Sequence, residues 1–168
     1  MADGAVYKTK SDTMEAHYYN VDVNWNEERK GVMCSPELNR DANSCIEVAT
    51  PPEFPKGMPG IWSPEHLFTA AVSSCLMTTF LSIAENSKLA FTSFSCKSKG
   101  KLEEVEGKFL MTEIILEPTV TVTDEKDRER AERVLQKSEA ACLISNSVKS
   151  KITMIPTIKI NEISRSIK

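Results

Sequence analysis

The residues best suited to chemistry are the cysteines. Cys75 lies in the apolar segment AVSSCLMTTF (residues 71–80), with no second cysteine two or four residues away and no histidine beside it. No C-x-x-C pair and no Cys/His cluster with zinc-ligand spacing occurs, so the sequence predicts free thiols, no metal site and no cofactor. The other cysteines are equally isolated: Cys34, Cys45, Cys96 and Cys142.

Cys75 and Cys142 lie on the apolar faces of two predicted helices, where free cysteine commonly serves as a small core hydrophobe. A reactive Cys75 would need a lowered pKa, because the thiolate is the nucleophile and apolar burial raises the pKa. Cys75 lies twelve residues after the predicted N-cap Ser63, too far for the helix dipole to act. We therefore expect a cation beside a reactive Cys75. Arginine fits best, with Glu65 to orient it.

The element that must position Cys75 is a long helix from Ser63 to about Ser87. Ser63 suits an N-cap, Pro64 suits the first helical position, and Glu65 places a carboxylate in the first turn. No Gly or Pro follows within this segment, and apolar residues extend nearly around the helix. The pattern predicts burial on several sides, in a core shared with a second subunit.

A second helix over residues 125–149 can be capped by Asp124, and its apolar face includes Cys142. The element order is βββ-α-ββ-α-β, an α+β fold with antiparallel sheets packed on two helices. Alternating segments predict the strands: 14–23, 29–34, 45–50, two or three within 90–122 broken near Gly100 and Gly107, and 152–160.

The composition is that of one globular domain over residues 1–168, with 27% charged and 40% hydrophobic residues. The net charge of -3 and the scattered Lys and Arg disfavour nucleic acid as a partner. We find no secretory signal and no run of 18 apolar residues. The sequence predicts a cytoplasmic protein with no membrane association.

Two motifs resemble those of the OsmC/Ohr family, the osmotically inducible and organic-hydroperoxide-resistance proteins. WSPEHLFTAAVSSCLMTTF (residues 62–80) has the family's Pro-Glu helix start followed about ten residues later by a cysteine. AERVLQKSEAACLISNSVKSKI (residues 131–152) matches the second motif through Cys142 and Ser145. The two cysteines are 67 residues apart, and the element order agrees across almost the whole chain.

The resemblance implies an OsmC/Ohr-like fold and an intertwined homodimer with active sites at the subunit interface. By motif position, Cys75 matches the peroxidatic cysteine, Cys142 the resolving cysteine, and Glu65 the carboxylate that orients an arginine. Arg29, in ERKGVMCS (residues 28–35), is the best match to that arginine, and Arg40 is the alternative.

The implied activity is the reduction of organic hydroperoxides to alcohols. Cys75 becomes a sulfenic acid, Cys142 converts it to a disulfide, and an external dithiol reduces the disulfide. In the family this reductant can be a lipoylated protein.

The chain departs from the peroxide-resistance branch, which has Asn-Pro-Glu where this chain has Ser63-Pro64-Glu65, and an aromatic residue where Leu76 stands. It is closer to less-characterised OsmC-like branches. The alternative function is a non-catalytic small-molecule-binding or redox-sensing dimer of the same fold.

Overall fold

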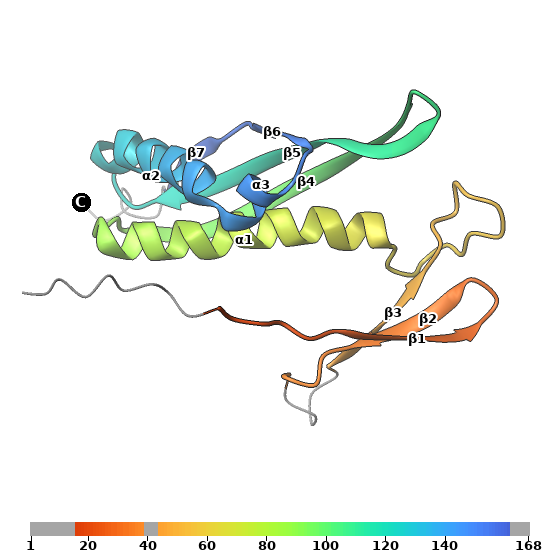
Figure 1. Ribbon diagram of the computed structural model, residues 1–168. Coiled ribbons are helices and arrows are strands. Elements are labelled where there is room, and N and C mark those ends of the chain that lie inside the picture. The colour runs from red at the N-terminus through yellow and green to blue at the C-terminus, as the bar shows by residue number, and fades with distance from the viewer. Residues whose placement is uncertain (1–15, 39–43, 162–168) are drawn as a thin grey trace, which may run out of the picture.

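The computed structural model describes residues 16–38 and 44–161, in which a three-stranded sheet stands apart from a larger body of helices on a second sheet (Figure 1). The elements in chain order are β1 (Asp22–Glu27), β2 (Lys30–Cys34), β3 (Cys45–Ala49), α1 (Pro64–Asn86), β4 (Phe91–Val105), β5 (Lys108–Val122), the 3-10 helix η1 (Glu125–Asp127), α2 (Arg128–Ala141), α3 (Leu143–Ser147), β6 (Lys151–Met154) and β7 (Thr157–Ile160).

The larger sheet is built on the long antiparallel hairpin of β4 and β5. The hairpin turns at Glu106 and Gly107, which both have positive φ, as a tight turn between twisted strands requires. β6 and β7 pair with β5 in parallel, because α2 and α3 carry the chain back across the sheet. The sheet is therefore mixed rather than purely antiparallel. The predicted last strand is divided at Ile155 and Pro156.

Helix α1 begins and ends where the sequence predicts. Ser63 is its N-cap and accepts a hydrogen bond from the His66 N–H at 3.4 Å, and the Ser63 N–H donates to His66 Nδ1 at 3.3 Å. This is a capping box in which histidine takes the place of the usual Glu or Gln. Ser87 is the C-cap. The cap fixes the first turn, and therefore the position of Glu65.

The core lies between α1, α2 and the larger sheet. Four α1 residues are fully buried: Val72, Leu76, Phe80 and Ala84. On another face Met77 is exposed and Leu81 is 42% exposed, so burial on several sides is not found in the single chain. By length and composition α1 could cross a membrane, but core helices pass the same test, and α1 packs here against β4, β5 and α2.

Gly100 does not break a strand as expected, since β4 runs straight through it. A Cβ at this position would come within 2.3 Å of Thr69 Oγ1 and 2.5 Å of Met111 Cε. The glycine lets α1 approach the sheet closely, and the real turn lies at Gly107.

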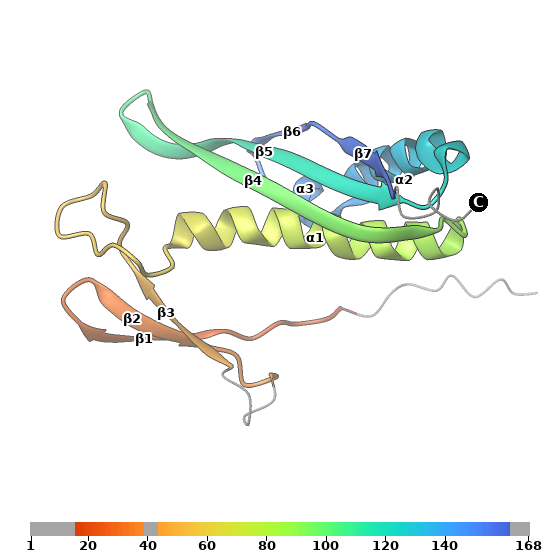
Figure 2. The same ribbon diagram turned by 180° about the vertical axis from the view of Figure 1, so that it is seen from behind.

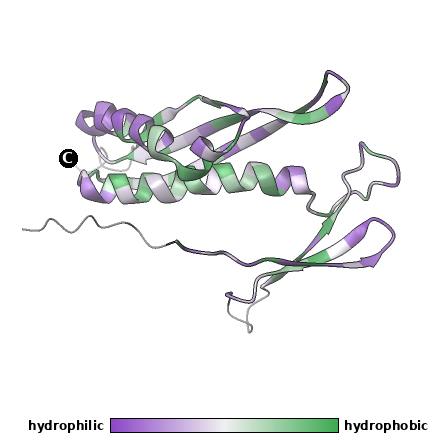
Figure 3. Ribbon diagram, in the orientation of Figure 1, coloured by the Kyte–Doolittle hydropathy of each residue, from purple (hydrophilic) through white to green (hydrophobic). Residues whose placement is uncertain are grey.

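The smaller sheet, in the order β1-β2-β3, has little core of its own. All six residues of β1 are exposed, including Trp25 at 75%, and of the three strands only Gly31 and Ala49 are buried. Both views show this sheet beside α1 rather than packed into the body (Figure 2), and its strands carry apolar residues (Figure 3). Of the first predicted strand, 14–23, residues 14 and 15 lie outside the described residues, and β1 begins only at Asp22.

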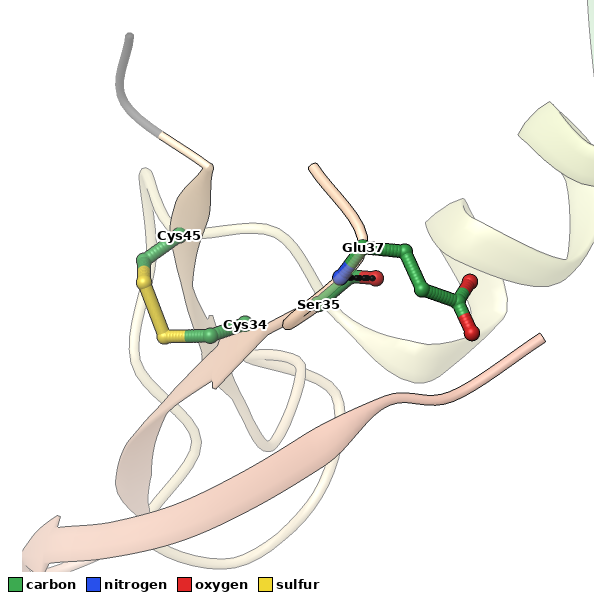
Figure 4. Close-up of a disulfide and its surroundings, with 4 residues drawn as sticks. All are labelled: Cys34, Ser35, Glu37 and Cys45. Carbon is green, nitrogen blue, oxygen red and sulfur yellow. Dashed lines mark hydrogen bonds between the residues drawn. A yellow bond between two sulfur atoms is a disulfide. The ribbon is translucent and has the colours of Figure 1, made fainter. Parts of the chain in front are cut away.

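Cys34 and Cys45 form a disulfide across β2 and β3 (Figure 4). They are direct partners in the antiparallel ladder, with Cα atoms 4.2 Å apart. The expectation of free thiols is therefore wrong for this pair, whereas Cys75, Cys96 and Cys142 are free. The pairing follows from the strand register, which brings together residues 11 apart in sequence.

Candidate active site

The structure brings Cys75 and Cys142 together. Cys75 lies on the side of α1 that faces the junction between α2 and α3, and its Sγ accepts a hydrogen bond from the Ile144 N–H at 3.5 Å. The Cys142 side chain and the Leu143 backbone N–H lie close enough to this sulfur to lower its pKa. Thr79, one turn further along α1, places its Oγ1 4.0 Å from Cys75 Sγ. Cys75 is partly buried and Cys142 is fully buried.

The chain breaks its helix at Cys142, which is the C-cap of α2 and the N-cap of α3. Its extended backbone (φ -64°, ψ 113°) corrects the expectation of one continuous helix over residues 125–149. The Asn146 side chain holds the junction, because its Nδ2 donates to the carbonyl oxygens of Ala140 and Cys142, each at 3.0 Å. The break turns the Ile144 N–H toward Cys75.

The two sulfurs differ in pKa. Burial acts to raise the pKa of Cys75, but hydrogen bonds from Cys142, Ile144, Thr79 and Leu143 outweigh it, so the pKa lies below its ordinary value. Burial raises the pKa of Cys142, and the neighbouring Cys75 raises it further. Cys75 is therefore the more acidic of the two thiols, and Cys142 is the one that more readily keeps its proton. Sequence reasoning missed the contributions of Thr79 and Ile144.

Glu65 lies in the first turn of α1, as expected. Its Oε2 is buried and has no hydrogen-bond partner within residues 16–38 and 44–161 of a single chain. A buried carboxylate oxygen without a donor is costly to maintain. Glu65 is therefore suited to receive a donor that one chain does not supply.

Arg29 is exposed in the two-residue turn between β1 and β2, where its carbonyl oxygen accepts a hydrogen bond from the Thr50 N–H at 3.1 Å. No ion pair or hydrogen bond in the described part of the chain joins Arg29 to Glu65 or Cys75. Arg40 lies outside the described residues. The role of either arginine stays a prediction.

A cavity of about 730 Å³ lies between the first half of α1 and the β4–β5 hairpin. Glu65 lines it, but Cys75 does not. Its wall includes Trp62, His66, Cys96, Phe109 and Met111. Among the residues that the structure describes, no group of three or more His, Cys, Asp or Glu could hold a metal ion.

The fold and motifs match a known family, whose model, described as OsmC-like protein, covers residues 57–156. Comparison with curated protein sequences gives no match. The structure resembles an OsmC-like protein of unknown function from Vibrio cholerae, with a TM-score of 0.72 and 23% identity over 84% of this chain and 99% of that chain.

The structure also resembles two organic hydroperoxide resistance proteins. For the one from Elizabethkingia anophelis the TM-score is 0.67, at 20% identity over 88% of this chain and 99% of that chain. For the one from Legionella pneumophila the TM-score is 0.62, at 20% identity over 86% of this chain and 98% of that chain. At these identities the likeness shows the fold, and the expected α+β fold class is confirmed. Because the family model matches more than half of the chain, the chain belongs to the OsmC-like protein family.

Proposed function

We propose that the protein is a thiol-dependent peroxidase that reduces organic hydroperoxides to alcohols. The observation that carries this proposal is the hydrogen bond from the Ile144 N–H to the Cys75 sulfur, with the buried Cys142 thiol beside it, an arrangement that lowers the pKa of Cys75 and raises that of Cys142. Family membership and the hydroperoxide resistance proteins of the same fold support a peroxide-related role. A cytoplasmic location belongs to the same proposal.

In the proposed reaction the Cys75 thiolate attacks the distal oxygen of the hydroperoxide and the O–O bond breaks. The alkoxide takes up a proton and leaves as the alcohol, and Cys75 becomes a sulfenic acid. The Cys142 thiol then attacks the Cys75 sulfur, which releases water and forms a Cys75–Cys142 disulfide. An external dithiol, for which a lipoylated protein is our candidate, reduces this bond through a mixed disulfide.

The proposal includes a homodimer that completes the site. The exposed face of α1 with Met77 and Leu81, and the uncovered sheet with Trp25, are apolar surfaces that a second chain can bury. Glu65 has a buried oxygen that needs a donor, and Arg29 is an exposed cation without an ion pair in the described part of one chain. We propose that Arg29 meets Glu65 and Cys75 in the dimer.

The experiment that tests this function measures the consumption of cumene hydroperoxide with dithiothreitol or dihydrolipoamide as the reductant. We expect Cys75→Ser to abolish turnover, and Cys142→Ser, treated with peroxide before any reductant is added, to stop at the Cys75 sulfenic acid. Cys96→Ser, which removes a free thiol away from this pair, is the matched control and should keep the wild-type rate. An active Cys75→Ser variant would contradict the proposal.

Peptide mapping gives an independent readout, since trypsin leaves Cys75 in residues 57–88 and Cys142 in residues 138–149. After one equivalent of peroxide these two peptides should be linked.

The cavity favours small-molecule binding as the alternative function. It contains the unpaired Glu65 oxygen and an apolar wall with Trp62 and Phe109, but not Cys75. A protein that only binds ligands there would show no linked cysteine peptides after peroxide treatment. A redox sensor would show the link but turn over slowly.

A further inference from the structure

The chain carries a second cysteine pair in a different part of the fold. Cys34 ends β2 and Cys45 begins β3, so their disulfide lies at the end of the smaller sheet where the chain passes from β2 to β3 (Figure 4). Cys75 and Cys142 belong to the helical layer and are free thiols in the same structure. The fold therefore holds one pair oxidised while the other is reduced.

The Cys34–Cys45 disulfide is open to attack by an external thiol. Cys45 is exposed and Cys34 is partly exposed, and the strands on which they lie contribute only Gly31 and Ala49 to any core. Thiol–disulfide exchange requires access of the attacking thiolate to a sulfur, and exposed disulfides are more often labile than buried ones. This bond is accessible in a way that a disulfide inside a core is not.

Ion pairs link the three strands of the smaller sheet near the end opposite to the disulfide. Lys30 Nζ forms ion pairs with Glu27 at 3.3 Å and Glu47 at 3.2 Å, and these three residues come from β2, β1 and β3. The ladder of β2 and β3 pairs Lys30 with Ala49 and continues to the cysteines. Reduction would remove the covalent link at the cysteine end, while the β2–β3 pairing and the short chain segment from Cys34 to Cys45 keep the two thiols near each other, so the bond can form again.

We propose that Cys34 and Cys45 form a second thiol–disulfide site, which external dithiols reduce and external disulfides re-form, independently of Cys75 and Cys142. One thiolate of the dithiol attacks Cys45 Sγ, the S–S bond breaks, and Cys34 leaves as a thiolate that takes up a proton. The second thiol of the reductant then attacks the mixed disulfide and releases Cys45. Two electrons and two protons pass from the dithiol to the protein. This site does not depend on the proposed peroxidase function.

Peptide mapping of the native protein tests the proposal, because trypsin cleaves after Arg40, between the two cysteines. The protein is equilibrated in glutathione buffers of stepwise redox ratio, and free thiols are alkylated before digestion. In oxidising buffer we expect peptides 31–40 and 41–56 to be linked by a disulfide. The link should be lost as reduced glutathione or dithiothreitol increases, and should return on reoxidation.

The five cysteines fall in five different tryptic peptides, so each pair is read separately. The redox midpoint of the 31–40 to 41–56 link should be the same in wild type, Cys75→Ser and Cys142→Ser. A link that never forms, or that is reduced only after denaturation, would overturn the proposal. A midpoint that moves in the Cys75→Ser variant would overturn the independence of the two sites.

Hydrogen exchange provides the structural readout. On reduction, amides at the cysteine end of β2 and β3 should exchange faster, and those of α1 should not change. The Cys34→Ser/Cys45→Ser double variant should match reduced wild type in oxidising and in reducing buffer. If its amides instead match oxidised wild type, the disulfide does not hold the end of the sheet, and the proposal of a change between two states fails.

Discussion

At the scale of single residues, the pKa of Cys75 is lowered by hydrogen bonds rather than by a cation in the part of the chain that the structure describes. Burial raises its pKa, and donors on α1 and α3 reverse that effect. The Ile144 N–H lies 3.5 Å and the Thr79 hydroxyl 4.0 Å from the sulfur. A cysteine whose pKa is lowered in this way forms its thiolate at a lower pH than a free cysteine does. The pH dependence of its alkylation therefore measures the effect of these hydrogen bonds.

Thr79→Val tests this explanation. The substitution keeps the shape of the side chain but removes the hydroxyl, so the pKa of Cys75 should rise by up to about one unit, because a hydrogen bond is worth about 1 kcal/mol. The midpoint of the pH dependence of iodoacetamide alkylation at Cys75 measures the shift. Thr79→Ser keeps the donor and should restore the wild-type midpoint. An unchanged midpoint in the valine variant would show that the Thr79 hydroxyl does not affect the pKa of Cys75.

At the scale of elements, the break between α2 and α3 positions the donors of the site. A continuous helix would direct the Ile144 N–H along its axis to a carbonyl four residues earlier. The break at Cys142 leaves that group free to reach Cys75. The Asn146 side chain donates hydrogen bonds to the Ala140 and Cys142 carbonyl oxygens at the break. These two bonds stabilise the turn that presents the Ile144 N–H to Cys75.

Asn146→Ala should therefore affect both stability and reactivity. The loss of two hydrogen bonds should lower the free energy of unfolding by about 1 to 2 kcal/mol, measured by urea denaturation. The pKa of Cys75 should rise, because the turn that presents the Ile144 N–H loosens. Gln136→Ala removes an exposed amide from α2 and is the matched control. Wild-type alkylation in Asn146→Ala would show that the junction holds without this side chain.

The elements differ in how far the sequence could predict them. The bounds of α1 follow from Ser63 and Pro64, since capping is a local interaction. The break at Cys142 has no Gly or Pro to mark it and depends on packing against α1. The disulfide depends on the register of β2 and β3, which a pattern of alternating residues does not fix.

At the scale of the whole molecule, three features of the described residues favour the proposed dimer. The smaller sheet has almost no core, part of α1 is exposed, and Glu65 has a buried oxygen without a donor in the described residues. The homodimer that we propose would satisfy all three, if the second chain covers α1 and the smaller sheet and brings its own Arg29 to Glu65. Catalysis would then depend on a residue supplied in trans.

Mixing two inactive variants tests this arrangement. Arg29→Ala keeps Cys75 and Cys75→Ser keeps Arg29, so a heterodimer holds one intact site if the arginine acts across the interface. Random mixing should then restore about one quarter of wild-type activity, because half of the dimers are heterodimers with one working site of two. Leu81→Glu in both chains places a charge on the apolar face of α1 and should prevent this restoration, with loss of the dimer in sedimentation velocity. Lys137→Glu, on the exposed side of α2, is the matched control and should leave the recovered activity and the dimer unchanged.

If the subunits exchange but activity does not recover, Arg29 is not the residue supplied in trans. The same mixture made with Arg40→Ala in place of Arg29→Ala then tests whether Arg40 is that residue.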